Sequence, residues 1–156
     1  MHIARETLLV PKSVTKKQDA LTDADYEALA NLRYALRRFT DFSTSAAQHE
    51  GLPSQQHQAL LAIKGHRGEA PMTVGDLSER LVVARHTASE LVERLVGAGY
   101  VTRELDPHDR RRQTLALTAK AEDILTRLSA IHLTEIREMA PRLIELLNDL
   151  QIKGPL

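Results

Sequence analysis

Two short polar runs in the middle of the chain have the chemistry to contact a nucleic acid. The first is Arg110-Arg111-Arg112, with Asp106 and Asp109 just before it. A guanidinium is weakly hydrated and suits the narrow, electronegative minor groove of DNA. A neighbouring aspartate can hold such a loop in shape through an ion pair or an Asx-type turn. Three arginines in a turn are often no more than a solvated loop, so their place in the fold decides between the two interpretations.

The second run combines small side chains with hydrogen-bond donors, and its members are Ala84, Arg85, His86, Thr87, Ser89 and Glu90. Arg85 can pair with guanine O6 and N7, while Thr87 and Ser89 can bond to a phosphate or a base edge. His86 can donate to a phosphate in either protonation state, more strongly when charged. Glu90 repels phosphates unless it accepts from cytosine N4 or orients Arg85.

The second run lies on a predicted pair of short helices. Thr73 and Asp76 resemble a capping box, which predicts the start of the first helix. After a break at residues 82–83, apolar side chains recur at helical spacing over residues 84–96, and the Gly-Ala-Gly of residues 97–99 ends the second helix. Its apolar face must pack on the core, so its polar first turn is expected to face outwards.

The arginine run lies at the tip of a predicted β-hairpin. Residues 100–103 and 113–117 have strand composition, and residues 106–109 (Asp-Pro-His-Asp) have turn chemistry. Two short helices followed at once by a hairpin with a charged tip describe a winged helix-turn-helix. In that module the second helix enters the major groove of DNA, which is about 12 Å wide.

A long amphipathic helix is predicted ahead of this module, from Asp23 to about Gln48. Its apolar residues recur at steps of three or four and are Tyr26, Leu29, Leu32, Leu36, Phe39, Phe42 and Ala46. A helix of this length is roughly 36 Å long. The stripe is either a subunit interface or the face of a central core helix, and the residues alone leave the two equal. Ser54 offers an N-cap to the next helix.

Two more helices are predicted after the hairpin. Thr118 caps the first, and Pro141 starts or kinks the last. Residues 1–22 lack sustained periodicity and are expected to form an N-terminal arm. The predicted fold class is mainly α with a small β-hairpin wing.

The composition excludes several classes of protein. The chain of 156 residues has no cysteine, which excludes disulfides, thiolate metal sites and Cys nucleophiles. Aromatic residues make up 3%, too few for base-stacking platforms. No Gly-rich phosphate loop, G-x-S-x-G or H-E-x-x-H motif is present and no two histidines stand four apart, so neither an enzyme nor a metal site is expected. With no signal peptide or apolar span visible, we expect a soluble, cytoplasmic protein.

The net charge is an argument against nucleic-acid binding, because 21 Lys and Arg balance 21 Asp and Glu. By segment the charge is +2 over residues 1–20, −2 over 21–52, +1 over 53–118 and −1 over 119–156. Positive charge is concentrated at Arg85 and the three hairpin arginines. We therefore expect weak non-specific DNA binding and strong reliance on a dimer.

The sequence resembles the MarR family of bacterial transcriptional regulators. The resemblance is carried by residues 77–81 (LSERL), 87–95 (TASELVERL), 99–101 (GYV), the hairpin tip 106–112 (DPHDRRR) and 115–118 (LALT). The tip followed by a strand ending in Leu-Thr is its most specific part.

The resemblance implies a dimer that binds double-stranded DNA and that usually represses genes until a small molecule releases it. It matches the family's wing aspartate to Asp109 and its minor-groove arginine to Arg111, between Arg110 and Arg112, and its recognition-helix contacts to residues 84–90. The family dimerises through its first and last two helices, which favours the interface interpretation of the stripe. The domains implied are an arm (1–22), a helical dimerisation region (23–52 and 119–156) and a winged helix-turn-helix domain (53–118) acting in the cytoplasm of a bacterium or archaeon.

The resemblance also implies an effector pocket between the dimer helices and the DNA-binding part. Candidate lining residues are Phe39, Phe42, Ser43, His49, His57 and Arg67. No cofactor is expected, and the resemblance implies a small organic molecule as the effector. The alternative is a helical dimerising module whose winged domain binds protein rather than DNA; the salt dependence of binding discriminates the two.

Overall fold

The long helices and the hairpin predicted from the sequence are present in the computed structural model, which describes residues 20–151. The elements in chain order are α1 (Asp23–His49), α2 (Ser54–Lys64), α3 (Val74–Leu81), α4 (Arg85–Gly97), β1 (Val101–Leu105), β2 (Gln113–Leu117) and α5 (Ala119–Gln151). Of the N-terminal segment predicted over residues 1–22, residues 1–19 lie outside the described residues. The mainly helical fold class with one antiparallel hairpin is confirmed.

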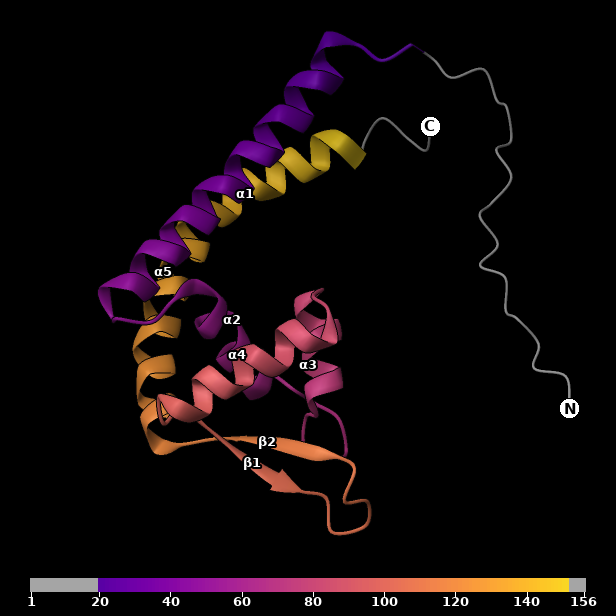
Figure 1. Cartoon of the computed structure of the whole chain (residues 1–156). Helices are drawn as coiled ribbons and strands as arrows, with labels where there is room; N and C mark the ends of the chain where they lie inside the picture. The colour runs from indigo at the N-terminus through magenta and orange to yellow at the C-terminus, as the bar shows by residue number, and fades with distance from the viewer. Residues whose placement is uncertain (1–19, 152–156) are drawn as a thin grey trace, which may run out of the picture.

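Two parts are visible in Figure 1. α1 and the second half of α5 run side by side as a long two-helix arm, which is called the arm below. α2, α3, α4 and the hairpin gather around the first half of α5 and form the winged part. Among the described helices, none has a stretch long and apolar enough to span a bilayer.

Side chains cap the starts of α1 and α3, whereas α2 and α4 start without a side-chain cap. Thr22 opens α1 and Thr73 opens α3 through capping boxes, the second as predicted. Ser54 does not cap α2, which corrects the prediction. It is the first helical residue, and Pro53 takes the cap position without a side-chain hydrogen bond. The Ser54 hydroxyl instead accepts from Gln58 Nε2 at 3.1 Å.

The helix pair turns at Val82, whose φ of 56° is left-handed. The Val83 N–H then donates to the Ser78 carbonyl at 3.0 Å, which closes the end of α3. A β-branched residue rarely adopts this conformation, so the surrounding chain must hold it. The turn lets α4 begin at Arg85, three residues later.

The hairpin is joined to the helix pair. β1 and β2 pair antiparallel, with Val101 opposite Leu117 and Leu105 opposite Gln113. The Leu115 N–H donates to the Met72 carbonyl at 2.8 Å, beside an isolated bridge to Thr73. The base of the wing is thus fixed against the start of α3.

The two helices predicted after the hairpin are a single helix. α5 continues from Ala119 to Gln151 with Pro141 inside it, so Pro141 does not start a helix. A proline inside a helix removes one backbone hydrogen bond, and its ring crowds the carbonyl of the residue four positions earlier, so this position is unfavourable by itself. Packing against α1, which buries Leu146, keeps the helix continuous beyond that point.

The core sits under the helix pair and the hairpin rather than along the arm. Its largest fully buried members are Leu52, Leu60, Leu77, Leu95, Leu128, Val92 and Val101. The arm beyond residue 128 contributes a single buried apolar side chain among the described residues, Leu146.

Candidate nucleic-acid interface and adjoining cavity

The first turn of α4 faces solvent as the sequence predicts. Ala84, Arg85, His86 and Glu90 are exposed, while Thr87 and Ser89 are half-buried at the edge of this surface. The opposite face is buried and consists of Ala88, Leu91, Val92 and Leu95. Ala84 caps the helix without a side-chain hydrogen bond. The polar run is therefore presented outwards by a helix anchored in the core.

Arg85 lies across the start of α3, an arrangement that the sequence alone does not reveal. A Cβ built on Gly75 would stand 2.8 Å from Arg85 Nη2, closer than real side chains approach. The guanidinium can occupy this place only because residue 75 has no side chain. Gly75 is thus a positioning residue for Arg85.

The hairpin tip is held by its own aspartates through Asx turns. The His108 N–H donates to Asp106 Oδ1 at 2.9 Å, and the Arg111 N–H donates to Asp109 Oδ1 at 3.0 Å. A backbone bond from Asp106 N–H to the Arg112 carbonyl closes the loop at 3.0 Å. The sequence allowed the aspartates either an ion pair or an Asx-type turn, and in the structure they form the Asx turns.

The wing arginines keep their guanidinium groups available. Arg110, Arg111 and Arg112 are exposed, and the ion pairs in the described part of the chain involve none of them. The pKa of Asp76 is lowered, first by the backbone N–H of Thr73 and also by the positive charge of Arg112. Arg112 thus acts on Asp76 and Arg85 lies on Gly75. Both cationic groups thus act on the first turn of α3, one at Asp76 and the other at Gly75.

A cavity of about 650 Å³ lies between α1, α2 and α5. Its lining residues are Phe39, Thr40, Ser43, Thr44, Ser54, His57, Gln58, Leu61, Ser129, His132, Leu133 and Ile136. Three of the six candidate pocket residues, Phe39, Ser43 and His57, come together here. A cavity of this size suits a small organic ligand.

The other three candidates lie elsewhere. Phe42 packs its ring edge-on to His132, with centroids 5.8 Å apart, but is not among the lining residues. His49 is exposed at the end of α1, and Arg67 borders a separate hollow beside α2 and α3. The structure does not bring His49 and Arg67 to the cavity.

His132 is one of the lining residues that the sequence did not point to. Its Nδ1 lies 2.5 Å from the Leu128 carbonyl oxygen and its Nε2 lies 2.8 Å from Ser43 Oγ. A carbonyl oxygen only accepts, so Nδ1 carries the proton and Nε2 of the neutral ring accepts from the Ser43 hydroxyl. The available signal was its spacing, four residues after Leu128 on the apolar face of the helix.

His57 faces His132 across the cavity wall, with ring centroids 4.9 Å apart. Burial, and then the proximity of His132, lower the pKa of His57. The side chain is only 3% exposed, and its Nδ1 has no hydrogen-bond partner among the described residues. No group of three or more His, Asp or Glu within residues 20–151 could hold a metal ion.

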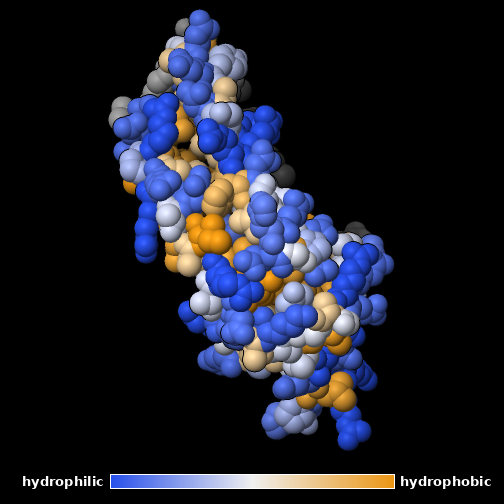
Figure 2. All heavy atoms as spheres, turned by 90° about the vertical axis from the view of Figure 1, so that its left-hand side faces the viewer, coloured by the Kyte–Doolittle hydropathy of each residue, from blue (hydrophilic) through white to orange (hydrophobic). Residues whose placement is uncertain are grey.

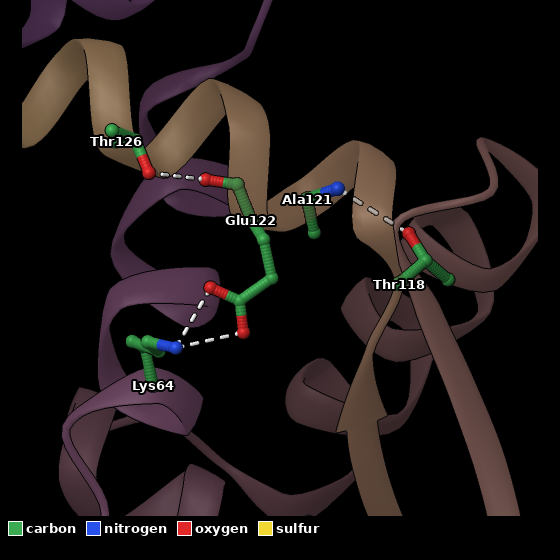
Figure 3. Close-up of polar contacts among 5 residues, drawn as sticks. All are labelled: Lys64, Thr118, Ala121, Glu122 and Thr126. Atoms are coloured by element: carbon green, nitrogen blue, oxygen red, sulfur yellow. Dashed lines mark hydrogen bonds and ion pairs between the residues drawn. The ribbon is translucent and has the colours of Figure 1, made fainter.

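An ion pair fastens the first turns of α5 to the end of α2 (Figure 3). Lys64 Nζ lies 2.7 Å from Glu122 Oε2, and Thr118 Oγ1 accepts from the Ala121 N–H at 3.3 Å as the predicted N-cap. Arg127 pairs with Glu50, just after α1, at 3.1 Å. The winged part and the arm therefore share α5 as a common support.

Comparison with known proteins agrees with this geometry. Residues 50–112 match the sequence profile of the MarR family. The transcriptional regulator HosA of Escherichia coli is 34% identical over 94 residues, covering 59% of this chain and 67% of HosA. The HTH-type transcriptional regulator YcgE of Bacillus subtilis is 39% identical over 85 residues, covering 53% of each chain. The chain thus spans between about half and two thirds of the length of these relatives.

Solved structures share the fold. The MarR family regulator AbsC from Streptomyces coelicolor superposes with a TM-score of 0.69 at 22% identity, covering 85% of this chain and 93% of AbsC. MepR of Staphylococcus aureus in complex with DNA gives a TM-score of 0.65 at 20% identity, covering 86% of this chain and 93% of MepR. The helix pair, the hairpin and the two long helices are thus the winged helix-turn-helix architecture of these regulators, and the chain belongs to the MarR family.

Proposed function

We propose that the protein is a sequence-specific, DNA-binding transcriptional regulator that acts as a homodimer. The observation that carries the proposal is the surface where the first turn of α4, the start of α3 and the wing meet. Arg85 lies on Gly75 there, and the charge of Arg112 acts on the adjacent Asp76. A cationic, solvent-facing surface built on a buried core suits a phosphate backbone.

The groups on this surface divide into two roles. In the proposal α4 enters the major groove, where Arg85, Thr87 and Ser89 contact base edges and His86 contacts a phosphate. The wing reaches the minor groove with Arg111, flanked by Arg110 and Arg112. Asp109 holds the wing backbone through its bond to the Arg111 N–H rather than touching DNA.

The arm supports the homodimer. Its exposed large apolar side chains are Leu21, Tyr26, Leu29, Tyr34, Leu36, Ile131, Leu133, Ile136, Ile144 and Leu147. Apolar atoms gather where the narrow upper part of the molecule joins the wider part (Figure 2). A second copy of α1 and α5 would cover this surface. Two recognition helices about 34 Å apart would then match the half-sites of a pseudo-palindrome.

The cavity supports a ligand-responsive repressor. It lies between the arm and α2, so a molecule bound there contacts both the proposed dimer helices and the winged part. A ligand that favours one spacing of the recognition helices releases or strengthens DNA binding. The proposal needs no cofactor and places the protein in the cytoplasm of a bacterium or archaeon, where its DNA target lies.

The test is DNA binding as a function of salt. We expect the protein to bind a fragment of its own promoter with an affinity that falls steeply as salt rises. The log–log slope should be near −0.9 for each phosphate neutralised, summed over several contacts. Fluorescence anisotropy with labelled promoter and scrambled duplexes measures both slope and specificity. Binding that does not change with salt, or no DNA binding, would favour a winged domain that binds protein.

A further inference from the structure

Arg67 is a candidate site residue that the proposed function leaves without a role. It borders a hollow of about 450 Å³ between α2 and α3, which is called the α2–α3 hollow below. The nine residues that line it include Arg67 and Arg80 and no Asp or Glu. The α2–α3 hollow shares Gln58 and Leu61 with the cavity between α1, α2 and α5, but neither arginine lines that cavity.

The floor of the α2–α3 hollow is apolar and aliphatic. Met72 is 4% exposed, and Ala62 and Leu81 are half-buried against the core. Leu61 lies beside them and is 49% exposed. The lining contains no Phe, Tyr or Trp, so a flat aromatic ring would find no stacking partner among these side chains. The floor therefore suits an aliphatic ligand body, whose burial would supply most of the binding energy.

The polar lining groups other than the arginines add no net charge of opposite sign. Gln58 Nε2 donates to the Ser54 hydroxyl at 3.1 Å, which leaves one amide hydrogen and the amide oxygen for a ligand. His66 Nε2 lies 3.0 Å from the Ala70 carbonyl oxygen, which only accepts, so this nitrogen carries a proton. A histidine ring is neutral or positive, never negative. The arginines thus decide which ligand charge the hollow favours.

The two arginines reach the α2–α3 hollow from different segments. Both are exposed, and the ion pairs in the described part of the chain involve neither of them. The acids nearest to them along the chain, Glu69 and Glu79, do not line the hollow. Arg80 lies in the last turn of α3, where the helix dipole favours a cation without any ligand. That explanation does not extend to Arg67, which lies in the loop after α2.

The α2–α3 hollow lies on a different flank of α3 from the proposed DNA surface. Arg85 lies on Gly75, and Arg80 follows Gly75 by five residues, which is about 140° around the helix. The proposed contacts with DNA therefore do not use Arg67 or Arg80. An anion in the hollow would balance both cations, and a guanidinium can hold a carboxylate through two parallel hydrogen bonds.

We propose that the α2–α3 hollow binds an aliphatic carboxylate, with Arg67 and Arg80 holding the carboxylate group and the chain lying on the apolar floor. This site is independent of the proposed DNA binding. A protein that fails to bind DNA would overturn the proposed function and leave this inference standing.

The experiment compares four ligands on the full chain without DNA, by isothermal titration calorimetry at neutral pH. Octanoate, octanamide and octylammonium share a chain and differ in charge, and acetate has the charge without the chain. We expect octanoate to bind tightest, with octanamide about tenfold weaker because it lacks the charge and acetate at least about a hundredfold weaker because it lacks the chain. No binding of octanoate, or binding of any other probe as tight as that of octanoate, overturns the inference.

Two substitutions locate the carboxylate. Arg67→Gln and Arg80→Gln should each weaken octanoate about five- to tenfold and leave octanamide unchanged. The matched control is Arg94→Gln, which removes an exposed arginine from the last turn of α4, outside the lining, and should change neither affinity. Unchanged octanoate affinity in both hollow variants would place the ligand elsewhere and overturn the inference. An equal loss for octanamide, or for the Arg94 variant, would contradict a contact between the carboxylate and these two arginines.

Discussion

The winged part and the arm handle apolar side chains in opposite ways. In the winged part, Leu60, Leu77 and Leu95 are fully buried. On the arm, Tyr26, Tyr34 and Ile144 remain more than half exposed in helices of similar amphipathic pattern. Apolar side chains with the same helical spacing are thus buried in the winged part and exposed on the arm. The winged part therefore has a core within one chain, while the arm leaves its apolar side chains exposed, as expected if the proposed second copy covers them.

The largest expected effect is on the stability of the winged part, through its buried core. Leu95→Ala removes a fully buried side chain at the centre of α4 and should lower the free energy of unfolding by about 3 kcal/mol. Urea unfolding followed by circular dichroism measures it. Leu105→Ala, at a leucine 60% exposed on the wing, is the control and should change stability little. Equal losses in the two variants would mean that α4 is not held by this core.

The next effect is on the proposed dimer, through the exposed apolar side chains of the arm. Leu29 and Leu36 lie on α1 with 47% and 50% exposure, and replacing both with Glu should shift the protein from dimer to monomer. A charge buried in an apolar interface costs several kcal/mol, so the dissociation constant should rise at least about a hundredfold. Sedimentation velocity reads the mass directly. Leu105→Glu adds a charge at a leucine outside the arm that is 60% exposed, and it should leave the mass unchanged; if it also dissociates the protein, the arm is not the interface.

A third change separates binding from assembly. Arg111→Ala should weaken promoter binding by about 1–3 kcal/mol and reduce the salt slope, without altering the dimer. Arg137→Ala removes an exposed arginine from α5 as the matched control. Unchanged affinity of the Arg111 variant in a mobility-shift assay would remove the wing from the interface.

Local chemistry explains what could be predicted within each region. The capping box at Thr73 and the Asx chemistry of Asp109 depend on residues within four positions of each other. Their partners are therefore readable along the chain. The apolar stripe of α1 could also be predicted from its spacing. The spacing does not show whether the surface that covers the stripe belongs to the same chain or to a second one.

Contacts distant in sequence explain what could not be predicted. Ser43 and His132 are 89 residues apart, and only the packing of α1 against α5 brings them together. Pro141 reads as a helix boundary by itself, yet the neighbouring helix α1 keeps α5 continuous. The placement of Arg85 on Gly75 likewise depends on the angle between two helices rather than on either sequence.

A pH titration probes the cavity where the two halves meet. The pKa of His57 is lower in the folded protein than its ordinary 6.5, so the unfolded chain binds a proton first as pH falls. The unfolding free energy should therefore decrease below about pH 6.5, by up to about 1.4 kcal/mol per unit, until the folded state also protonates. Urea unfolding at several pH values measures the slope. His57→Gln should flatten it, and His86→Gln, at an exposed position, should not; an unchanged slope in the His57 variant would assign the effect elsewhere.

The smallest expected effect tests how finely the winged part arranges its surface. Gly75→Ala should leave the fold intact, or stabilise α3 by about 0.5–1 kcal/mol, because alanine favours a helix. The new methyl group would displace the flexible Arg85 guanidinium, so base preference should change more than affinity. Gly97→Ala is the control, since a Cβ there meets nothing within 4 Å. Selection from a randomised operator library compares the variants. If the Gly75 variant keeps the wild-type preference, Arg85 reads DNA from a different position than the one it occupies on α3, and the surface reorganises on binding.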